Sequence, residues 1–262
     1  KKMIVFKLVG GLGNQLFEYA FARSLSHDID EELFLDISGY GYNIQVEHLI
    51  YCLHPFSIKA VVGNYPPETF IENRSFKGSL HIYEKAIPLT EYSLYREGRI
   101  EKEIGNIEFP AYFTGYYSAG FDENNIKVFT EKFFIHNEDI IREDLTYLPE
   151  ISDEFKGLIE EIKSSNSIAI HIRRGEYKDL ANFGTCSISY YQKAIDEIVS
   201  KVENPTFFVF SEDQEWVKKN IEIPYPHKHV YFNRQKHAVS AGYTELLKVF
   251  STCEHFIIAN ST

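Results

Sequence analysis

From about residue 150, short apolar runs alternate with segments that carry a helical hydrophobic face, and this rhythm constrains the fold most. The apolar runs lie at 167–172, 206–210, 229–232 and 255–259, and helices are expected over 151–162, 188–202, 212–220 and 240–250. Such alternation is typical of an α/β domain with a parallel sheet. The second run is apolar at nearly every position, which predicts a strand buried on both faces. Ser211 and Gln214 predict a capping box for the helix that follows it.

The beginning of the chain predicts a second unit of the same kind. Residues 3–9 fit a buried strand, three glycines follow within 10–13, and 33–35 fit another short strand. Between them we expect a helix with Asn14 as its N-cap. A strand, a glycine turn, a helix and a second strand are how a doubly wound sheet begins.

The pattern weakens between these two units. Periodicity is low over 37–112, and the apolar spacing over 121–134 predicts a helix. The segment 146–149 contains a proline and is interpreted as a linker. We therefore predict an N-terminal domain over 1–149 and a C-terminal domain over 150–262. A doubly wound domain continues into a helix after its last strand, so we also expect a C-terminal segment beyond Thr262.

The charge balance and the cysteines exclude several classes of protein. There are 27 basic and 38 acidic residues, a net charge of −11, which argues against a nucleic-acid partner. Three cysteines at spacings that fit neither disulfides nor zinc favour a reducing compartment. No signal peptide and no membrane span are predicted. These features predict a cytoplasmic protein.

The segment HIRRGEY at 171–177 is the first candidate site, because it follows the apolar run of a strand. Arg173 and Arg174 offer planar forks that match phosphate oxygens, and His171 stands beside them. The carboxyl end of a parallel strand is where open α/β sheets bind ligands. The alternative is a buried ion pair between one arginine and a carboxylate such as Glu176.

The glycine turn at 10–13 is the second candidate. Glycines allow a ligand to approach the backbone, and the N-terminus of the following helix favours an anion. Asn14 and Gln15 add two polar amides at the same place. The turn lacks the Lys-Ser/Thr of a phosphate-binding P-loop, and it also lacks the third glycine of the dinucleotide fingerprint. A purely structural strand-to-helix turn is the alternative.

Two further segments carry polar residues at positions where a ligand could bind. Asn260, Ser261 and Thr262 follow the last apolar run and could present hydroxyl and backbone N–H groups to a phosphate, or simply cap a helix. Asp28 and Asp30 resemble a metal-binding Asp-x-Asp pair, but they follow a helix and lead into more acidic residues. We interpret them as a solvated loop and predict no metal site.

Taken together, these segments resemble the α-1,2-fucosyltransferases of glycosyltransferase family 11. The resemblance covers the chain end to end and is weakest over 37–105. It rests on GGLGNQLFEYAFARSL at 10–25, TGYYSAGFDENN at 114–125, HIRRGEY at 171–177, FFVFSEDQEWVKKN at 207–220 and IIANST at 257–262. The family implies a GT-B fold, in which two Rossmann-like domains face a cleft. It also implies GDP-fucose as the donor, no metal requirement and inversion at the anomeric carbon.

The resemblance assigns roles to individual residues. Arg173 matches the arginine that holds the donor diphosphate, and His171 and Arg174 share its pocket. Residues beside the donor also include Asn260, Ser261 and Thr262, and, from the N-terminal domain, Gly11, Asn14 and Gln15. The family more often has Asp where this chain has Glu176, which is the remaining catalytic candidate. It often carries Asp at Leu246 as well, so the neighbouring Glu245 is the candidate for reading the guanine.

The expected function is transfer of L-fucose from GDP-fucose to the 2-hydroxyl of a terminal β-galactoside. The acceptor is expected to be a galactose-terminated oligosaccharide, read by the region 37–117. A cytoplasmic enzyme that makes surface glycans is compatible with peripheral association at the inner membrane face. Two alternatives remain open: fucosyl transfer to another position, and a non-catalytic protein that binds nucleotide sugars or glycans on the same scaffold.

Overall fold

A computed structural model describes residues 3–40, 50–65, 111–114, 119–121, 127–129, 131–174, 185–231 and 242–260. Within it the chain forms two compact units, Lys1–Leu148 and Pro149–Ser261. Most of the region expected to read the acceptor lies outside the described residues, as do Glu176, Ser261 and Thr262.

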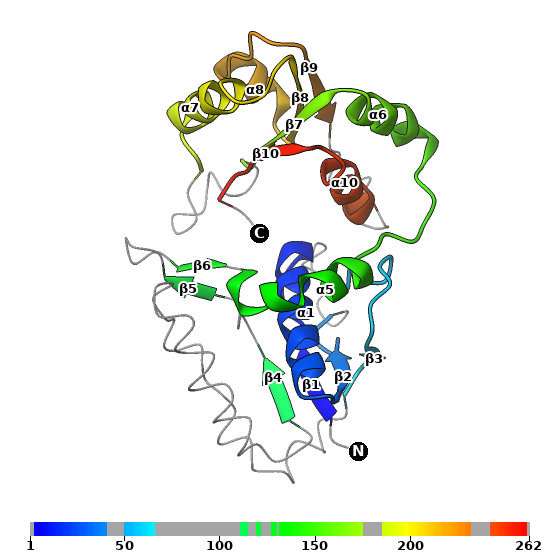
Figure 1. The fold of residues 1–262 in the computed structure, drawn as a ribbon. Helices are drawn as coiled ribbons and strands as arrows, with labels where there is room; N and C mark the ends of the chain where they lie inside the picture. The colour runs from blue at the N-terminus through cyan, green and yellow to red at the C-terminus, as the bar shows by residue number, and fades with distance from the viewer. Residues whose placement is uncertain are drawn as a thin grey trace. The chain divides into compact units, whose positions relative to one another are not determined.

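The first unit is built on a four-stranded sheet in the order β3-β2-β1-β4 (Figure 1). All three strand pairs are parallel. The strands are β1 (Met3–Lys7), β2 (Glu32–Asp36), β3 (Val61–Gly63) and β4 (Ala111–Thr114). Helix α1 (Leu12–Asp28) connects the first two strands, as the sequence pattern predicts.

A buried polar cluster joins α1 to helix α5 (Glu138–Asp144). The hydroxyl of Tyr19 donates to Asp144 Oδ2 at 2.7 Å and accepts from the backbone N–H of Lys59 at 2.9 Å. Arg23 Nε donates to the same carboxylate oxygen at 2.8 Å. Because each group has a partner, the cluster costs little to bury and ties the end of this unit back to its first helix.

Two local predictions for this unit are wrong. The helix expected over 121–134 is instead an antiparallel pair, β5 (Ala119–Phe121) and β6 (Lys127–Phe129), followed by single 3₁₀ turns η5 (Glu131–Phe133) and η6 (Ile135–Asn137). Phe133 and Phe134 pack edge-on against Phe21 and Phe17 of α1, so tertiary contact explains their spacing. The N-cap of α1 is Gly11, one turn before the expected Asn14.

The second unit contains another four-stranded sheet, in the order β10-β7-β8-β9. Every pair is parallel. The strands are β7 (Asn166–Ile172), β8 (Pro205–Ser211), β9 (His227–Tyr231) and β10 (His255–Ile257). The helices are α6 (Asp153–Lys163), α7 (Ile188–Val199), α8 (Gln214–Asn220) and α10 (Gly242–Phe250). The protein is therefore an α/β protein with parallel sheets, as predicted.

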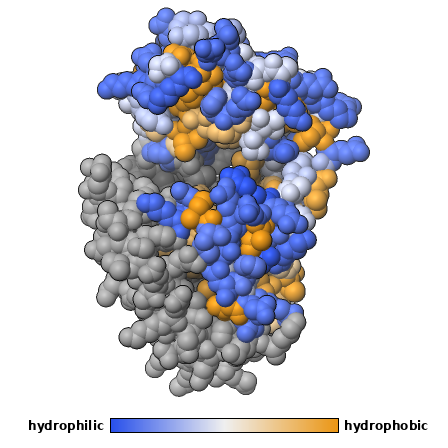
Figure 2. Space-filling model, in the orientation of Figure 1, coloured by the Kyte–Doolittle hydropathy of each residue, from blue (hydrophilic) through white to orange (hydrophobic). Residues whose placement is uncertain are grey.

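On the face drawn in Figure 2, hydrophobic residues of the coloured parts form separate groups among hydrophilic ones. Across the described ranges, no helix is both long enough and apolar enough to cross a membrane. The expected peripheral association with a membrane stays a prediction.

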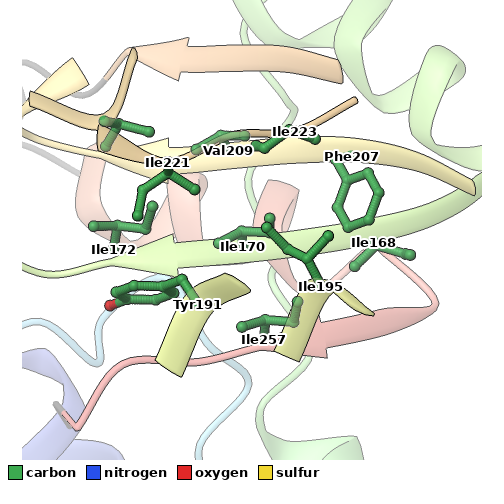
Figure 3. Packing of buried hydrophobic residues seen from close by; sticks show 11 residues of the cluster. Ile168, Ile170, Ile172, Tyr191, Ile195, Phe207, Val209, Ile221, Ile223 and Ile257 are labelled. Atoms are coloured by element: carbon green, nitrogen blue, oxygen red, sulfur yellow. The ribbon is translucent and has the colours of Figure 1, made fainter. Parts of the chain in front are cut away.

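The sheet of the second unit is covered on both faces (Figure 1). Alternate residues of a strand point to opposite faces, so each face has its own core. One core joins β7 and β8 to α7 and α8 through Ile168, Ile170, Ile172, Tyr191, Ile195, Phe207, Val209 and Val217 (Figure 3). The other joins the same strands to α6 and α10 through Phe155, Ile162, Ala169, Phe208, Phe210 and Val249.

The start of α8 differs from the predicted capping box. Asp213 is the N-cap and accepts from the backbone N–H of Trp216 at 3.3 Å. Ser211 is the last residue of β8, where it pairs with Tyr231. The Gln214 side chain points inward instead, donating to the carbonyls of Val209 and Val230 at 2.9 and 2.8 Å. These bonds lock α8 to the carboxyl ends of two strands.

Glu18 lies in α1 against the carboxyl end of β1. Its side chain is 1% exposed, and its Oε2 accepts from the backbone N–H of Val9 at 3.0 Å. Burial raises the pKa of this carboxyl to about 9, although the bond from Val9 opposes the shift. The group is therefore protonated and neutral at pH 7.

The pKa of Glu18 predicts a pH dependence of stability. Because the folded pKa lies above the unfolded value of 4.5, its contribution is complete below that value and is lost as pH rises toward about 9. The slope from one proton is at most about 1.4 kcal/mol per pH unit. Glu18→Gln keeps a neutral acceptor, so its free energy of unfolding should fall less than that of the wild type between pH 5 and 9 in urea titrations.

A matched control is Glu160→Gln, which changes an exposed glutamate of α6. It should follow the wild-type profile. Parallel profiles for Glu18→Gln and wild type across this range would contradict a neutral buried Glu18.

Candidate functional site

The parallel register of β7 and β8 creates the central feature of the candidate site. Ile172 pairs with Ser211 at the last position of both strands, so Arg173 and Glu212 leave the sheet side by side. Arg173 Nη1 donates to Glu212 Oε1 at 2.8 Å. The two side chains are only 18% and 14% exposed, which shields the pair from water.

Arg174 also contacts residues that follow β8. Its backbone N–H donates to Glu212 Oε1 at 3.2 Å, and its Nε lies 3.4 Å from Asp213 Oδ2. Its guanidinium stands 3.8 Å from the centre of the Trp216 ring, a cation–π contact. Carboxylates and an aromatic ring therefore fix the direction of both arginines.

The sequence leaves two interpretations of the arginines open: a phosphate site and a buried ion pair with a carboxylate. The structure decides between them only in part. Both arginines are in ion pairs, but their partners are Glu212 and Asp213, whereas Glu176 lies outside the described residues. A cation whose direction is fixed in advance stabilises developing negative charge without reorganising, so ion-paired arginines are also compatible with an anion site. Contact with a donor phosphate stays a prediction.

His171 adds no positive charge to this site at neutral pH. Burial lowers its pKa and Arg173 lowers it further, while Glu212 opposes the shift. Its ring meets Phe250 of α10 edge-on, with 6.1 Å between ring centres. His171 therefore packs on the α10 side of the sheet as a neutral side chain, and the positive charge comes from the arginines.

Asn260 lies just beyond β10, the strand that pairs with β7 on its other side. It is exposed, and its Oδ1 accepts from Cys186 Sγ at 3.4 Å. The structure thus brings Asn260 to the same edge of the sheet as Arg173, because the carboxyl ends of parallel neighbours share one edge.

Glu245 has a structural partner in its own unit. Its Oε1 accepts from the backbone N–H of Ser152 at 2.6 Å, at the N-cap of α6. The bond links α10 to the start of α6, while the neighbouring Leu246 packs into the core under these helices. The role of Glu245 in reading a guanine stays a prediction.

The glycine turn of the first unit is shaped by Gly10. Its φ is +78°, and a Cβ added there would lie 2.1 Å from Asn14 Nδ2. Only glycine adopts this conformation readily and leaves room for Asn14 against the backbone. Gly11 then starts α1 as its N-cap, and Asn14 lies in the first turn of that helix.

Gln15 is bound to the protein's own backbone. Its side chain is fully buried, with Nε2 donating to the carbonyls of Gly10 and Ile50 at 3.1 and 2.8 Å. Its Oε1 accepts from the N–H of Cys52 at 2.8 Å. In this structure Gln15 therefore supports the glycine turn from behind, and contact with a donor would require it to give up these bonds.

Sequence reasoning missed Glu212, Asp213 and Trp216 as parts of the site. The pattern of their segment predicts only a strand followed by a capped helix. The available signal was geometric: if 167–172 and 206–211 are adjacent parallel strands, the residues after each must meet. Two arginines after one strand and two carboxylates after the next make an ion-paired edge.

The acidic residues weighed for a metal have other partners. Asp28 Oδ2 lies 2.8 Å from His136 Nε2, and its Oδ1 accepts from Asn137 at 2.8 Å. Among the described residues, no group of three or more His, Cys, Asp or Glu side chains could hold a metal ion. A reaction without a metal stays a prediction.

The fold and this edge define an α/β protein with two fixed arginines, each paired with a carboxylate, at the carboxyl ends of parallel strands. The model of the family "Glycosyl transferase family 11" matches residues 7–262, and the chain belongs to this family. Membership of glycosyltransferase family 11 is what the sequence motifs indicate, and it is confirmed.

Three relatives and one solved structure bear on the function. Alpha-1,2-colitosyltransferase of Escherichia coli is 28% identical over 99% of this chain and 84% of that protein. The O-antigen biosynthesis glycosyltransferase WbnK of Escherichia coli is 26% identical over 97% and 86%. Galactoside alpha-(1,2)-fucosyltransferase 1 of Sus scrofa is 29% identical over 34% of this chain and 28% of that protein.

The solved structure is that of NodZ, an alpha-1,6-fucosyltransferase soaked with GDP-fucose. It matches with a TM-score of 0.54 and 14% identity over 98% of this chain and 88% of that one. At this identity the likeness shows a shared fold, and it carries no assignment of individual residues.

Gly10 yields a prediction about the turn. Gly10→Ala should lower the free energy of unfolding by about 1–2 kcal/mol, because alanine is strained at positive φ and Asn14 must move. Gly157→Ala is the matched control, since no atom lies within 4 Å of an added Cβ in the middle of α6. It should raise stability by roughly 0.5–1 kcal/mol. Urea unfolding measures both, and equal effects would refute the strained turn.

Glu212 yields a prediction about the ion-paired edge. Glu212→Gln should lower the free energy of unfolding by about 1–2 kcal/mol, since it removes the charge that compensates a largely buried Arg173. Glu215→Gln, three residues on, breaks the pair of an exposed glutamate with Lys218. That change should stay within about 0.5 kcal/mol. An equally small effect at Glu212 would mean that Arg173 does not depend on it.

Proposed function

We propose that the protein transfers L-fucose from GDP-fucose to the 2-hydroxyl of a terminal β-galactoside, with inversion and without a metal. Family membership supports sugar transfer, and two relatives are named as α-1,2-transferases acting with fucose or colitose. The fold shared with NodZ is compatible with a GDP-sugar donor and with two Rossmann-like domains of the GT-B type. The acceptor is a galactose-terminated oligosaccharide.

The observation that carries the proposal is the fixed pair of arginines at the carboxyl end of β7. Arg173 and Arg174 are oriented by Glu212, Asp213 and Trp216, in a chain that belongs to this family. A diphosphate leaving group needs its charge neutralised as the glycosidic bond breaks. Arginine keeps its charge at any working pH and matches phosphate oxygens with its planar fork.

The proposed reaction begins with lengthening of the bond between C1 of fucose and the β-phosphate oxygen. Positive charge develops on the sugar ring, and negative charge grows on the phosphate oxygens. Arg173 binds this growing charge more strongly in the transition state than in the ground state, which is the condition for catalysis. The acceptor 2-hydroxyl attacks C1 from the opposite face, and GDP leaves with the electron pair of the broken bond.

The acceptor proton needs a receiver, and Glu176 is the carboxylate we propose for it. It follows Arg173 by three residues in the same motif. Its contacts lie outside the described residues, so the test is kinetic. Glu176→Gln should lower turnover and remove the acidic limb of the pH profile if Glu176 receives the proton.

A second donor is favoured by the relative that matches 99% of this chain. That protein is an α-1,2-colitosyltransferase, and colitose is L-fucose without its 3-hydroxyl. A pocket built for L-fucose hydrogen-bonds that hydroxyl, whereas a pocket built for colitose leaves no group there to satisfy it. Comparing kcat/KM for GDP-fucose and for GDP-colitose on the same enzyme therefore shows which donor the pocket prefers.

The deciding experiment incubates the protein with lactose in EDTA, using GDP-fucose and GDP-colitose in parallel. Fucosylated product with an α-1,2 linkage supports the proposal, and a higher kcat/KM for GDP-colitose supports the second donor. Another linkage on the product replaces the proposed position. GDP-fucose binding without turnover on any β-galactoside would favour a nucleotide-sugar binding protein.

Arg173 yields the prediction that tests the mechanism. Arg173→Ala should lower turnover on the order of a hundredfold or more, the usual effect of removing one contact to developing charge. Arg173→Lys should recover only part of this loss, because lysine lacks the planar fork. The matched control is Arg142→Ala, an arginine 76% exposed and paired with Glu138. Near-native turnover in Arg173→Ala would show the assignment to be wrong.

A further inference from the structure

Tyr191 places its hydroxyl close to Arg173, the first residue of the arginine loop (Arg173 and Arg174, which follow β7). It lies in the first turn of α7, whose N-cap Ser187 accepts from the N–H of Tyr190 at 3.1 Å. Its side chain is 1% exposed and belongs to the same core as Ile172 and Ile195. In Figure 3 its hydroxyl oxygen is turned toward the end where β7 leaves the sheet. The next residue there is Arg173.

The Tyr191 hydroxyl is buried without a hydrogen-bond partner of good geometry. Burial raises the pKa of this phenol, the Cys186 thiol raises it as well, and the backbone of Arg173 opposes the shift. Both groups are therefore its polar neighbours. A buried hydroxyl without a good partner is costly, and phenylalanine would fill the same core without that cost. The hydroxyl calls for a reason other than packing.

The neighbouring tyrosine shows what a purely structural hydroxyl looks like. Tyr190 is 40% exposed, and its hydroxyl donates to the carbonyl of Ile258 at 2.7 Å. The two rings meet edge-on at 5.1 Å. The Tyr190 hydroxyl is therefore bonded to the protein backbone, whereas the buried Tyr191 hydroxyl lies near Arg173 without such a bond.

Cys186 extends this arrangement to the neighbouring strand end. Its thiol donates to Asn260 Oδ1 at 3.4 Å. The same thiol is close enough to Tyr191 to raise the pKa of its phenol. It is half-buried, whereas Cys52 and Cys253 are buried. The thiol therefore lies between the ends of β7 and β10 and is the most accessible of the three cysteines.

We propose that Tyr191 is a positioning residue for Arg173, and that Tyr191, Cys186 and Asn260 line the subsite that takes the diphosphate of a nucleotide sugar. The inference rests on the proposed function and names further residues of that same site. The ring of Tyr191 is fixed in the core, so its hydroxyl holds one position beside the main chain of Arg173. It limits the displacement of the Arg173 main chain when the guanidinium binds a diphosphate.

The first test compares Tyr191→Phe with Tyr190→Phe in the intact protein. GDP affinity is measured by titration calorimetry, kcat and donor KM by product formation, and Tm by thermal unfolding. Tyr191→Phe should weaken GDP binding and raise donor KM by about three- to tenfold, because the main chain of Arg173 loses a fixed polar neighbour. Its Tm should equal or exceed that of the wild type, because an unpaired hydroxyl is removed.

Tyr190→Phe should behave in the opposite way. It loses the bond to Ile258, so its Tm should fall while GDP affinity stays that of the wild type. A merely structural Tyr191 predicts unchanged GDP affinity and KM, and that result overturns the proposal. Lower Tm together with weaker binding in Tyr191→Phe overturns it too, because packing alone would then account for both.

The second test uses the Cys186 thiol as a probe. N-ethylmaleimide labelling, followed for each cysteine by mass spectrometry, should modify Cys186 first and leave the buried Cys52 and Cys253 as internal references. GDP should slow labelling of Cys186 at least fivefold and leave the other two unchanged. Equal labelling with and without GDP removes Cys186 from the subsite and overturns the proposal as stated.

Wild-type binding of GDP separates this inference from the function on which it rests. If the wild type neither binds GDP nor transfers sugar from either GDP-sugar, the proposed function fails and the inference fails with it. If the wild type binds GDP and Tyr191→Phe binds equally well, the inference alone fails.

Discussion

The candidate site depends on one register between two parallel strands. Pairing Ile172 with Ser211 brings Arg173 against Glu212, although the two are 39 residues apart in the chain. Because the pair is largely shielded from water, neither charge is tolerable there without the other. Any shift of β8 against β7 would therefore both expose the core and leave a buried charge unpaired. Fold and site are stabilised by the same contact.

The elements of the second unit are predictable from sequence because each is a strong local pattern. The continuous apolar run of β8 and the helix α7 lie where the sequence indicates them. The error at α8 has a clear cause. Ser211 has the right chemistry for a cap, but the sheet uses it as a strand residue, so the cap passes to Asp213. Around Phe133, a helix-like spacing instead reflects contact with another helix.

Local sequence patterns predict only part of the candidate site. Paired arginines after an apolar strand stand out, whereas their partners depend on which strands are neighbours. The local pattern offers Glu176 as one candidate partner, which lies outside the described residues, whereas Glu212 and Asp213 come from a different part of the chain. Gln15 and Glu245 show a second limit. Residue type alone does not tell a side chain that faces a ligand from one that satisfies the backbone.

Two buried side-chain atoms without hydrogen-bond partners stand out among the described residues, Glu18 Oε1 and Tyr191 OH. Both lie beside the carboxyl end of a strand: Glu18 bonds the backbone just after β1, and Tyr191 acts on the backbone just after β7. Elsewhere, polar groups as buried as Gln15 and Asp144 are well paired. Because an unpaired buried group costs stability, its position is informative. Each unit thus has, near the sheet edge where α/β proteins bind ligands, a buried side-chain atom whose missing hydrogen bond costs stability.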